Sequence, residues 1–208
     1  MFGQAQRRPT SQPAPSPPPP ARTGIKIDVK GSFDGQNYTN KPLGLSMILP
    51  QGWEPQDTET QRQLAEKVDE TVHDRSGGTA AAQASVSRTA ILFILVRPTE
   101  GRTNPTILGM VEDIALAFNV RTPTQYLMAA RAIAEKSPLV FDNHVTTETI
   151  NGVEFAWLVA VPKDPSSSAR QRYYVTLRRN HAISFVVTYH GDDELKSGME
   201  VLHSLKFE

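Results

Sequence analysis

The sequence predicts an α+β fold in which helices flank a mainly antiparallel sheet, an α/β/α sandwich. Three observations lead to this fold class. Ala90 to Val96 are apolar at every position, which indicates a strand covered on both faces. Asn151-Gly152 separates two strand-like runs and is typical of a two-residue hairpin turn. Segments with the helical spacing of apolar residues lie between and after the strands, so they can cover the sheet.

Residues 1–31 have the composition of a disordered, proline-rich arm. Between Arg7 and Thr23, prolines alternate with Ser, Thr, Gln and Ala, a mixture that buries too little apolar surface to offset its ordering entropy. An extended polyproline-II-like spacer is expected there, and the run from Pro17 to Pro20 also permits an SH3-type ligand. We expect residues 32–208 to form one α+β domain.

The domain begins with two short strands and a helix. Tyr38 to Asn40 and Leu43 to Leu49 read as strands separated by Lys41-Pro42, and the odd residues of the second share one face. Pro50-Gln51-Gly52-Trp53 ends that strand. Thr58 to Gln61 offers a capping box with Thr58 as N-cap, so an amphipathic helix is expected from Thr58 to about Val72. Residues 75–88 read as a loop or a frayed helix.

The middle of the chain predicts a strand and a capped helix. Thr106 to Leu116 fits a helix or a strand, and its β-branched content favours a strand. Thr122-Pro123-Thr124-Gln125 then places an N-cap, a proline at the first helical position and a capping-box glutamine in order. Tyr126, Ala130 and Ile133 are expected to form the buried stripe of this helix.

The last third reads as two hairpins and a helix. The first hairpin joins residues 144–150 to 153–161 through Asn151-Gly152, and the second joins residues 172–179 to 181–189 about Asn180. Gly191 precedes acids that suit the start of a helix, because the helix dipole favours negative charge there. The expected buried stripe of this helix is Leu195, Met199 and Leu202.

This order of elements resembles the PsbP/Mog-type sandwich family. The motifs that carry the resemblance are Leu43–Leu49 with the following Pro50-Gln51-Gly52-Trp53, Thr122 to Leu127, Ile150 to Val153, and the block from Leu202 to Phe207. It covers about Phe33 to Glu208. The resemblance implies an antiparallel sheet between helical layers and a largely non-enzymatic role, as in extrinsic photosystem subunits, a Ran-binding protein and exported bacterial proteins. The resemblance does not assign a binding role to any residue of this chain.

Composition disfavours several function classes. Lys+Arg and Asp+Glu are balanced at 22 each, so the charge expected of a nucleic-acid-binding surface is missing. The chain contains no cysteine and no apolar run long enough for a transmembrane helix. The first residues lack a complete secretory signal, but Phe2 to Ala5 resemble the end of one. We therefore expect an exported protein whose start is incomplete, with a cytoplasmic location as the alternative.

No motif for a metal, a cofactor or a catalytic nucleophile is expected. The histidines lack metal-ligand spacing, and His181 and His190 are separated by an odd number of residues, so their side chains point to opposite faces of a strand. Ser46 lies inside a strand and lacks the second glycine of a nucleophile elbow. The acids Asp192 to Glu194 could contribute to a Ca²⁺ site, but the helix dipole explains them more simply.

One strand carries the candidate site. Arg170, Arg172, Tyr174 and Arg178 occupy alternate positions and therefore share one strand face. Arg and Tyr are the residue types that anchor interfaces and bind anions. The simpler interpretation is a solvated strand face, with Tyr173, Val175 and Leu177 directed to the core.

These observations favour a non-enzymatic binding or accessory domain that contacts a protein or a small anionic ligand, without a cofactor, in the bacterial envelope. Two alternatives stay open. One is a hydrolase that uses His144 or His190 with Asp142 or Asp192. The other is a purely structural module of an envelope assembly. Oligomeric state does not follow from the sequence.

Overall fold

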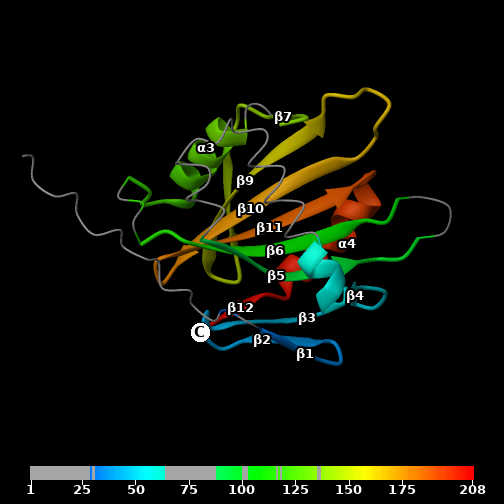
Figure 1. The fold of residues 1–208 in the computed structure, drawn as a ribbon, viewed down its shortest axis with the longest axis vertical. Coiled ribbons are helices and arrows are strands. Elements are labelled where there is room, and N and C mark those ends of the chain that lie inside the picture. The colour runs from blue at the N-terminus through cyan, green and yellow to red at the C-terminus, as the bar shows by residue number, and fades with distance from the viewer. Residues whose placement is uncertain are drawn as a thin grey trace, which may run out of the picture.

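Two antiparallel sheets form the frame of the computed structural model, which describes residues 29, 31–63, 88–99, 103–115, 117, 119–134 and 137–208 (Figure 1). The small sheet has the order β1 (Ser32–Asp34), β2 (Asn37–Asn40), β3 (Leu45–Ile48) and β12 (Lys206–Phe207). The large sheet has the order β4 (Glu54–Pro55), β5 (Thr89–Val96), β6 (Thr106–Asp113), β11 (His181–Tyr189), β10 (Arg170–Arg178), β9 (Val153–Pro162) and β7 (Leu139–Phe141), and β8 (Thr146–Ile150) also pairs with β9.

The antiparallel α+β fold is confirmed, and both faces of the large sheet are covered. On one face α3 (Pro123–Ile133) packs Leu127 against Leu158 and Val175. On the other face the small sheet and α4 (Asp192–His203) enclose the main core. The four-stranded sheet was not predicted as a separate layer, because its last strand comes from the far end of the sequence.

Aromatic rings join the two sheets in the main core. The Phe93 ring on β5 lies 5.0 Å from the Tyr38 ring of the small sheet and 6.1 Å from the Phe185 ring on β11, centroid to centroid. Phe93 faces Gly109 on the neighbouring strand, where a side chain would clash with the ring. The three rings are almost completely buried, and they tie β2, β5 and β11 together.

The predicted central strand lies near one edge of its sheet. Leu92 to Leu95 on β5 are buried in succession, as the two-faced pattern required. However, β5 pairs with β6 on one side and with only the two residues of β4 on the other. The central, most completely buried strand is β11. Thr106–Asp113 forms β6, so the strand expected there is confirmed.

Both predicted hairpins form with left-handed turn residues. Asn151 and Gly152 have φ of 49° and 80°, as a type I′ turn requires. The second turn consists of Arg179 and Asn180, with φ of 49° and 62°, so Arg179 belongs to the turn and not to the strand. The Asn151 side chain also donates hydrogen bonds to the carbonyl oxygens of His203 and Leu205, at 2.6 and 2.8 Å. It thereby satisfies backbone acceptors at the end of α4.

The predicted starts of α3 and α4, at Thr122 and Gly191, are correct, and the predicted start of the first helix is shifted. The Thr122 hydroxyl accepts a hydrogen bond from the Gln125 N–H, which confirms the N-cap of α3, while the Gln125 side chain accepts from Arg121 N–H. At the earlier helix, described over residues 58–63, the cap is Asp57 and not Thr58. The Asp57 carboxylate accepts from the Thr60 N–H at 2.9 Å. Asp57 is a strong N-cap residue, so it displaces Thr58 from that role.

The buried stripe predicted for α3 is wrong at Ile133. This side chain is 48% exposed, whereas Pro123 and Leu127 are buried. Tyr126 is half-buried and donates to the Glu112 carboxylate at 2.6 Å, and burial raises its pKa. Leu127 points to the sheet, whereas Ile133, in the last turn of α3, faces solvent. In α4, Leu202 is buried and Leu195 and Met199 are half-buried against the core, which matches the expected stripe.

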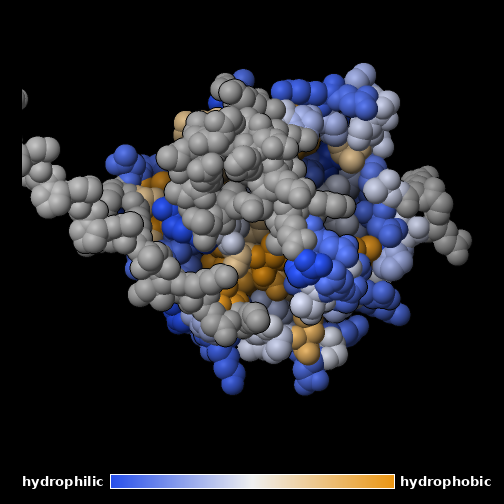
Figure 2. Space-filling model, in the orientation of Figure 1, coloured by the Kyte–Doolittle hydropathy of each residue, from blue (hydrophilic) through white to orange (hydrophobic). Residues whose placement is uncertain are grey.

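Several predictions fall outside the described residues. These are the proline-rich arm, apart from Val29 and Gly31, the continuation of the first helix to Val72, and the loop of residues 75–87. Within the described part of the chain, no helix is long and apolar enough to span a membrane. Figure 2 shows apolar side chains near the middle of the face in view, with hydrophilic ones to their right.

Candidate functional site

The face of β10 that carries the candidate residues is covered over much of its length. Tyr174 is fully buried, and it packs in the main core opposite Phe185. On the other face Val175 is equally buried beneath α3. The interpretation of a solvated strand face is therefore wrong, because layers cover the sheet on both sides. Arg170 is the exposed residue of this face, and Arg172 and Arg178 are partly exposed.

Arg172 is held inside the protein by aromatic side chains. Its guanidinium carbon lies 4.3 Å from the centre of the Trp157 ring, which gives a cation–π contact. Nη1 donates to the Tyr174 hydroxyl at 3.3 Å. Burial lowers the pKa of Arg172, but its hydrogen bonds to Tyr174 and Tyr189 outweigh burial and leave that pKa raised. Its buried Nε has no hydrogen-bond partner among the described residues.

Tyr174 links Arg172 to Glu148 on the preceding hairpin, which β8 and β9 form. Burial raises the pKa of Tyr174 to about 12; its hydrogen bond and charge interaction with Arg172 oppose this shift, and Glu148 reinforces it. The phenol is therefore neutral at pH 7. Arg172, Tyr174 and Tyr189 form a polar network under the surface, next to Arg170.

Arg178 has a different role, because the structure does not bring it to the other three residues. Its guanidinium lies 5.2 Å from the centre of the Phe207 ring and donates to the Glu208 carbonyl oxygen at 3.2 Å. Arg179 donates to the same oxygen at 3.1 Å. Both side chains thus hold β12 in place. Arg178 lies at the opposite end of β10 from Arg170, roughly 26 Å away at about 3.3 Å per residue.

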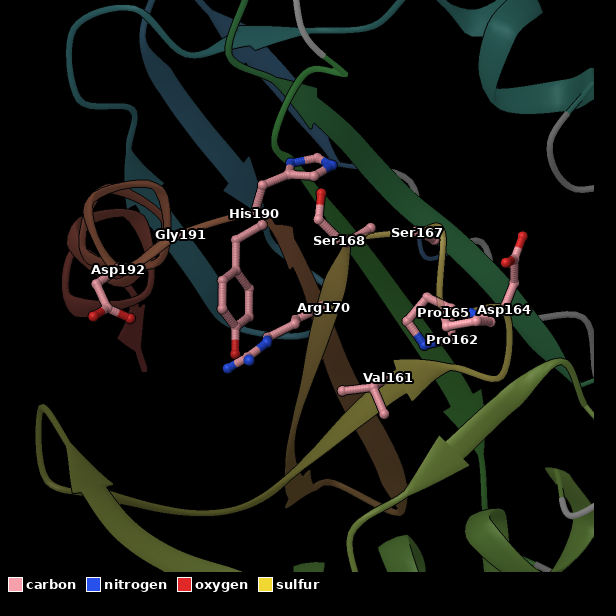
Figure 3. Close-up of a pocket in the computed structure, with 12 residues that line it drawn as sticks. Val161, Pro162, Asp164, Pro165, Ser167, Ser168, Arg170, His190, Gly191 and Asp192 are labelled. Atoms are coloured by element: carbon pink, nitrogen blue, oxygen red, sulfur yellow. The ribbon is translucent and has the colours of Figure 1, made fainter.

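An open groove of about 540 Å³ lies beside Arg170 (Figure 3). One wall is the segment between β9 and β10, with Pro165 and Ser168, and the other is the start of α4 at Gly191 and Asp192. Arg170 and Tyr189, which are cross-strand partners, line the groove. The groove therefore forms where two hairpin strands end and a helix begins.

The charged groups of the groove differ in how they are engaged. Among the described residues, no hydrogen bond or ion pair holds the exposed Arg170 guanidinium. Asp164 accepts from the N–H and the hydroxyl of Ser166, at 2.9 and 2.8 Å, and these bonds lower its pKa. The His190 imidazole contacts Glu194 at 3.2 Å. Arg170 is thus the cation left for an external group.

The groove contains residues that the sequence analysis did not assign to a site. Tyr189, Val161 and Ser168 line it, and His190, considered before only for the hydrolase alternative, lies beside them. The register of the second hairpin could have indicated Tyr189: with Arg179-Asn180 as a two-residue turn, Arg170 must pair with Tyr189. Nothing in the spacing indicated that the long connection after Pro162 would fold back beside α4.

The catalytic pairings considered for histidine are not formed. The His144 backbone N–H, and not its imidazole, donates to Asp142. The His190 imidazole meets Glu194 instead of Asp192, because an i,i+4 side chain lies on the same side at the start of α4. The structure also contains no group of three or more metal-ligating side chains among its described residues.

The architecture is similar to that of a cyanobacterial PsbP protein. The solution structure of cyanobacterial PsbP (CyanoP) from Synechocystis sp. PCC 6803 superposes with a TM-score of 0.51, covering 86% of this chain and 98% of that one. The protein has a PsbP-like fold. Sequence identity to CyanoP is 15%, so the likeness shows a shared fold and not a shared activity.

Other comparisons add no functional information about this PsbP-like domain. A Bacteroides thetaiotaomicron VPI-5482 protein superposes with a TM-score of 0.47 and 13% identity, over 85% of this chain and 49% of that one. No protein-family model matches the sequence, and no curated protein matches it. The groove residues of this PsbP-like domain must therefore be interpreted from their own chemistry.

Proposed function

We propose that the protein is a non-enzymatic binding or accessory domain, which holds an anionic group of a protein partner or small ligand in the groove at Arg170. The observation that carries the proposal is the free guanidinium of Arg170 at the edge of an open groove. A guanidinium presents paired donors that suit a carboxylate or phosphate. Arg172, fixed behind it by Trp157 and Tyr174, adds positive potential without needing to move.

We further propose that this binding takes place in the bacterial envelope. Support comes from the PsbP-like fold, because PsbP homologues are extracytoplasmic proteins. Fractionation of the native organism, with antibody detection of the protein, tests the location. Recovery in the cytoplasmic fraction alone would contradict it.

Substitution of Arg170 tests the binding site. We expect Arg170→Gln to weaken binding of acetate, succinate or inorganic phosphate by about ten- to a hundredfold, because a charge-assisted hydrogen bond to the ligand is lost. The measurement is an NMR titration that follows backbone amides of Ser168, Tyr189 and Gly191. Lys163→Gln is the matched control, since it removes the same charge from an exposed residue outside the groove. Equal binding by both variants, or no saturable shift, would contradict the proposal.

One arrangement favours a hydrolase as the second candidate function. His190, held by Glu194, lines the same groove as Ser168. A hydroxyl, an imidazole and a carboxylate in series are the components of nucleophilic catalysis. If this function is correct, Ser168→Ala will reduce hydrolysis of activated esters by at least about a hundredfold, while Ser167→Ala leaves it nearly unchanged. Absence of turnover by the unaltered protein excludes this candidate.

A further inference from the structure

Two exposed valines lie beside the groove on the face that carries Arg170. Val140 on β7 and Val161 on β9 are cross-strand partners, and they are 51% and 37% exposed. Val161 also lines the groove. Large apolar side chains exposed side by side at a groove are typical of an interaction surface. The apolar pair and the groove are therefore one continuous surface.

The strand order places the valines and Arg170 in a row across the sheet. Strands β7, β9 and β10 are consecutive neighbours, and Ala160 pairs with Gln171, so Val161 lies next to Arg170. With about 4.8 Å between strands, the midpoint of the valine pair is about 7 Å from the Arg170 backbone. Residues i and i+2 of an extended segment are also about 7 Å apart and point to the same side. One extended segment can thus contact both features at once.

The two features call for different side chains on that segment. The valine pair offers a surface for one apolar side chain. No ion pair with a described residue engages Arg170; of the two carboxylates that line the groove, Asp164 accepts from Ser166 and Asp192 lies at the start of α4. The complementary segment therefore has one apolar residue and one acidic residue, separated by one position.

We propose that the groove binds an extended segment of a partner protein with an apolar-x-acidic pattern, which crosses β7, β9 and β10. The apolar side chain rests on Val140 and Val161, and the carboxylate pairs with Arg170. This inference rests on the proposed function and specifies its ligand class. The expected ligand is therefore a peptide segment and not a free small anion.

Selection from a displayed library of short random segments on the full-length protein tests the pattern. We expect enrichment of sequences with an apolar and an acidic residue two positions apart. A synthetic peptide from the enriched set should bind Val140→Ser/Val161→Ser about tenfold more weakly than the unaltered protein, because its apolar contact is lost. Val140→Ile/Val161→Ile, which keeps the apolar surface, is the control and should bind within about twofold of it.

A double-mutant cycle tests the carboxylate contact. Replacing the peptide's Glu by Gln should weaken binding to the unaltered protein by about tenfold and leave binding to Arg170→Gln unchanged. A purely structural role of Arg170 would not produce this coupling. Enriched sequences without the pattern, or equal affinity for the serine variant, would overturn the inference. If phosphate binding still depends on Arg170 in that case, the proposed function stands and only the peptide assignment fails.

Discussion

Gly109→Ala is expected to destabilise the domain by about 3 kcal/mol, the cost of forcing an extra group into a closely packed core. A Cβ at this position would lie 2.6 Å from the Phe93 ring, which is fully buried and rests on the glycine. The ring has no space to retreat, because Tyr38 and Phe185 pack against it. Thermal unfolding should show a midpoint lowered by about 6–12 °C.

Phe93→Leu provides the second half of this test. The smaller side chain removes the clash, so Gly109→Ala should cost about 1–2 kcal/mol less in that background than alone. Gly191→Ala is the control, since a Cβ there meets no atom within 4 Å, and we expect it to cost less than about 1 kcal/mol through the weaker N-cap. Additive effects of the Gly109 and Phe93 substitutions would show that the contact with the ring is not the cause.

Asn40→Ala is expected to cost a similar free energy, about 3 kcal/mol, for a polar reason. Asn40 is completely buried. Its Nδ2 donates to the Val29 carbonyl oxygen at 2.6 Å and to the Tyr38 hydroxyl at 3.2 Å, and its Oδ1 accepts from the Leu43 N–H at 3.1 Å. Alanine leaves these buried groups without partners. Urea unfolding measures the loss, and Asn37→Ala, an exposed position on the same strand, should change stability by less than about 0.5 kcal/mol.

Asn40→Asp separates the donor role from the acceptor role of this side chain. A carboxylate still accepts from Leu43 but cannot donate to Val29, and burial raises the pKa of a carboxyl group above its unfolded value. The folded state then binds the proton more tightly, so stability is greatest below the unfolded pKa and falls as pH rises through the folded pKa. The variant should be closer to the unaltered protein at pH 4 than at pH 7. The opposite pH trend would contradict the buried-donor role.

The parts of the fold that could be predicted are those determined by neighbouring residues. Asn151-Gly152 fixes its hairpin because both residues tolerate positive φ, and Thr122-Pro123 fixes the start of α3 because it combines a cap with a preset φ. The parts that were missed depend on distant contacts. The bond from Tyr126 to Glu112 on β6 and the pairing of Lys206 with Ser46 in β12 both join residues of different elements.

For the candidate site too, the sequence predicted the features that depend on neighbouring residues and missed those that depend on distant contacts. Alternation along β10 correctly placed Arg170, Arg172 and Tyr174 on one face, since the side-chain period of a strand is two. It could not indicate that Arg178 contacts Phe207, or that Trp157 on β9 holds Arg172. These partners come from other strands and loops. Local sequence therefore gave the direction of each side chain, and tertiary packing decided whether it remained available for a ligand.

The position of β3 has a consequence for how the chain is made. β3 lies between β2, its neighbour along the sequence, and β12, which consists of Lys206 and Phe207. A ribosome releases β3 into solution long before β12 has been synthesised. One side of β3 thus stays unpaired during translation, and an unpaired strand edge favours aggregation. Nascent chains arrested before residue 206 should consequently need chaperone protection that the full-length chain no longer requires.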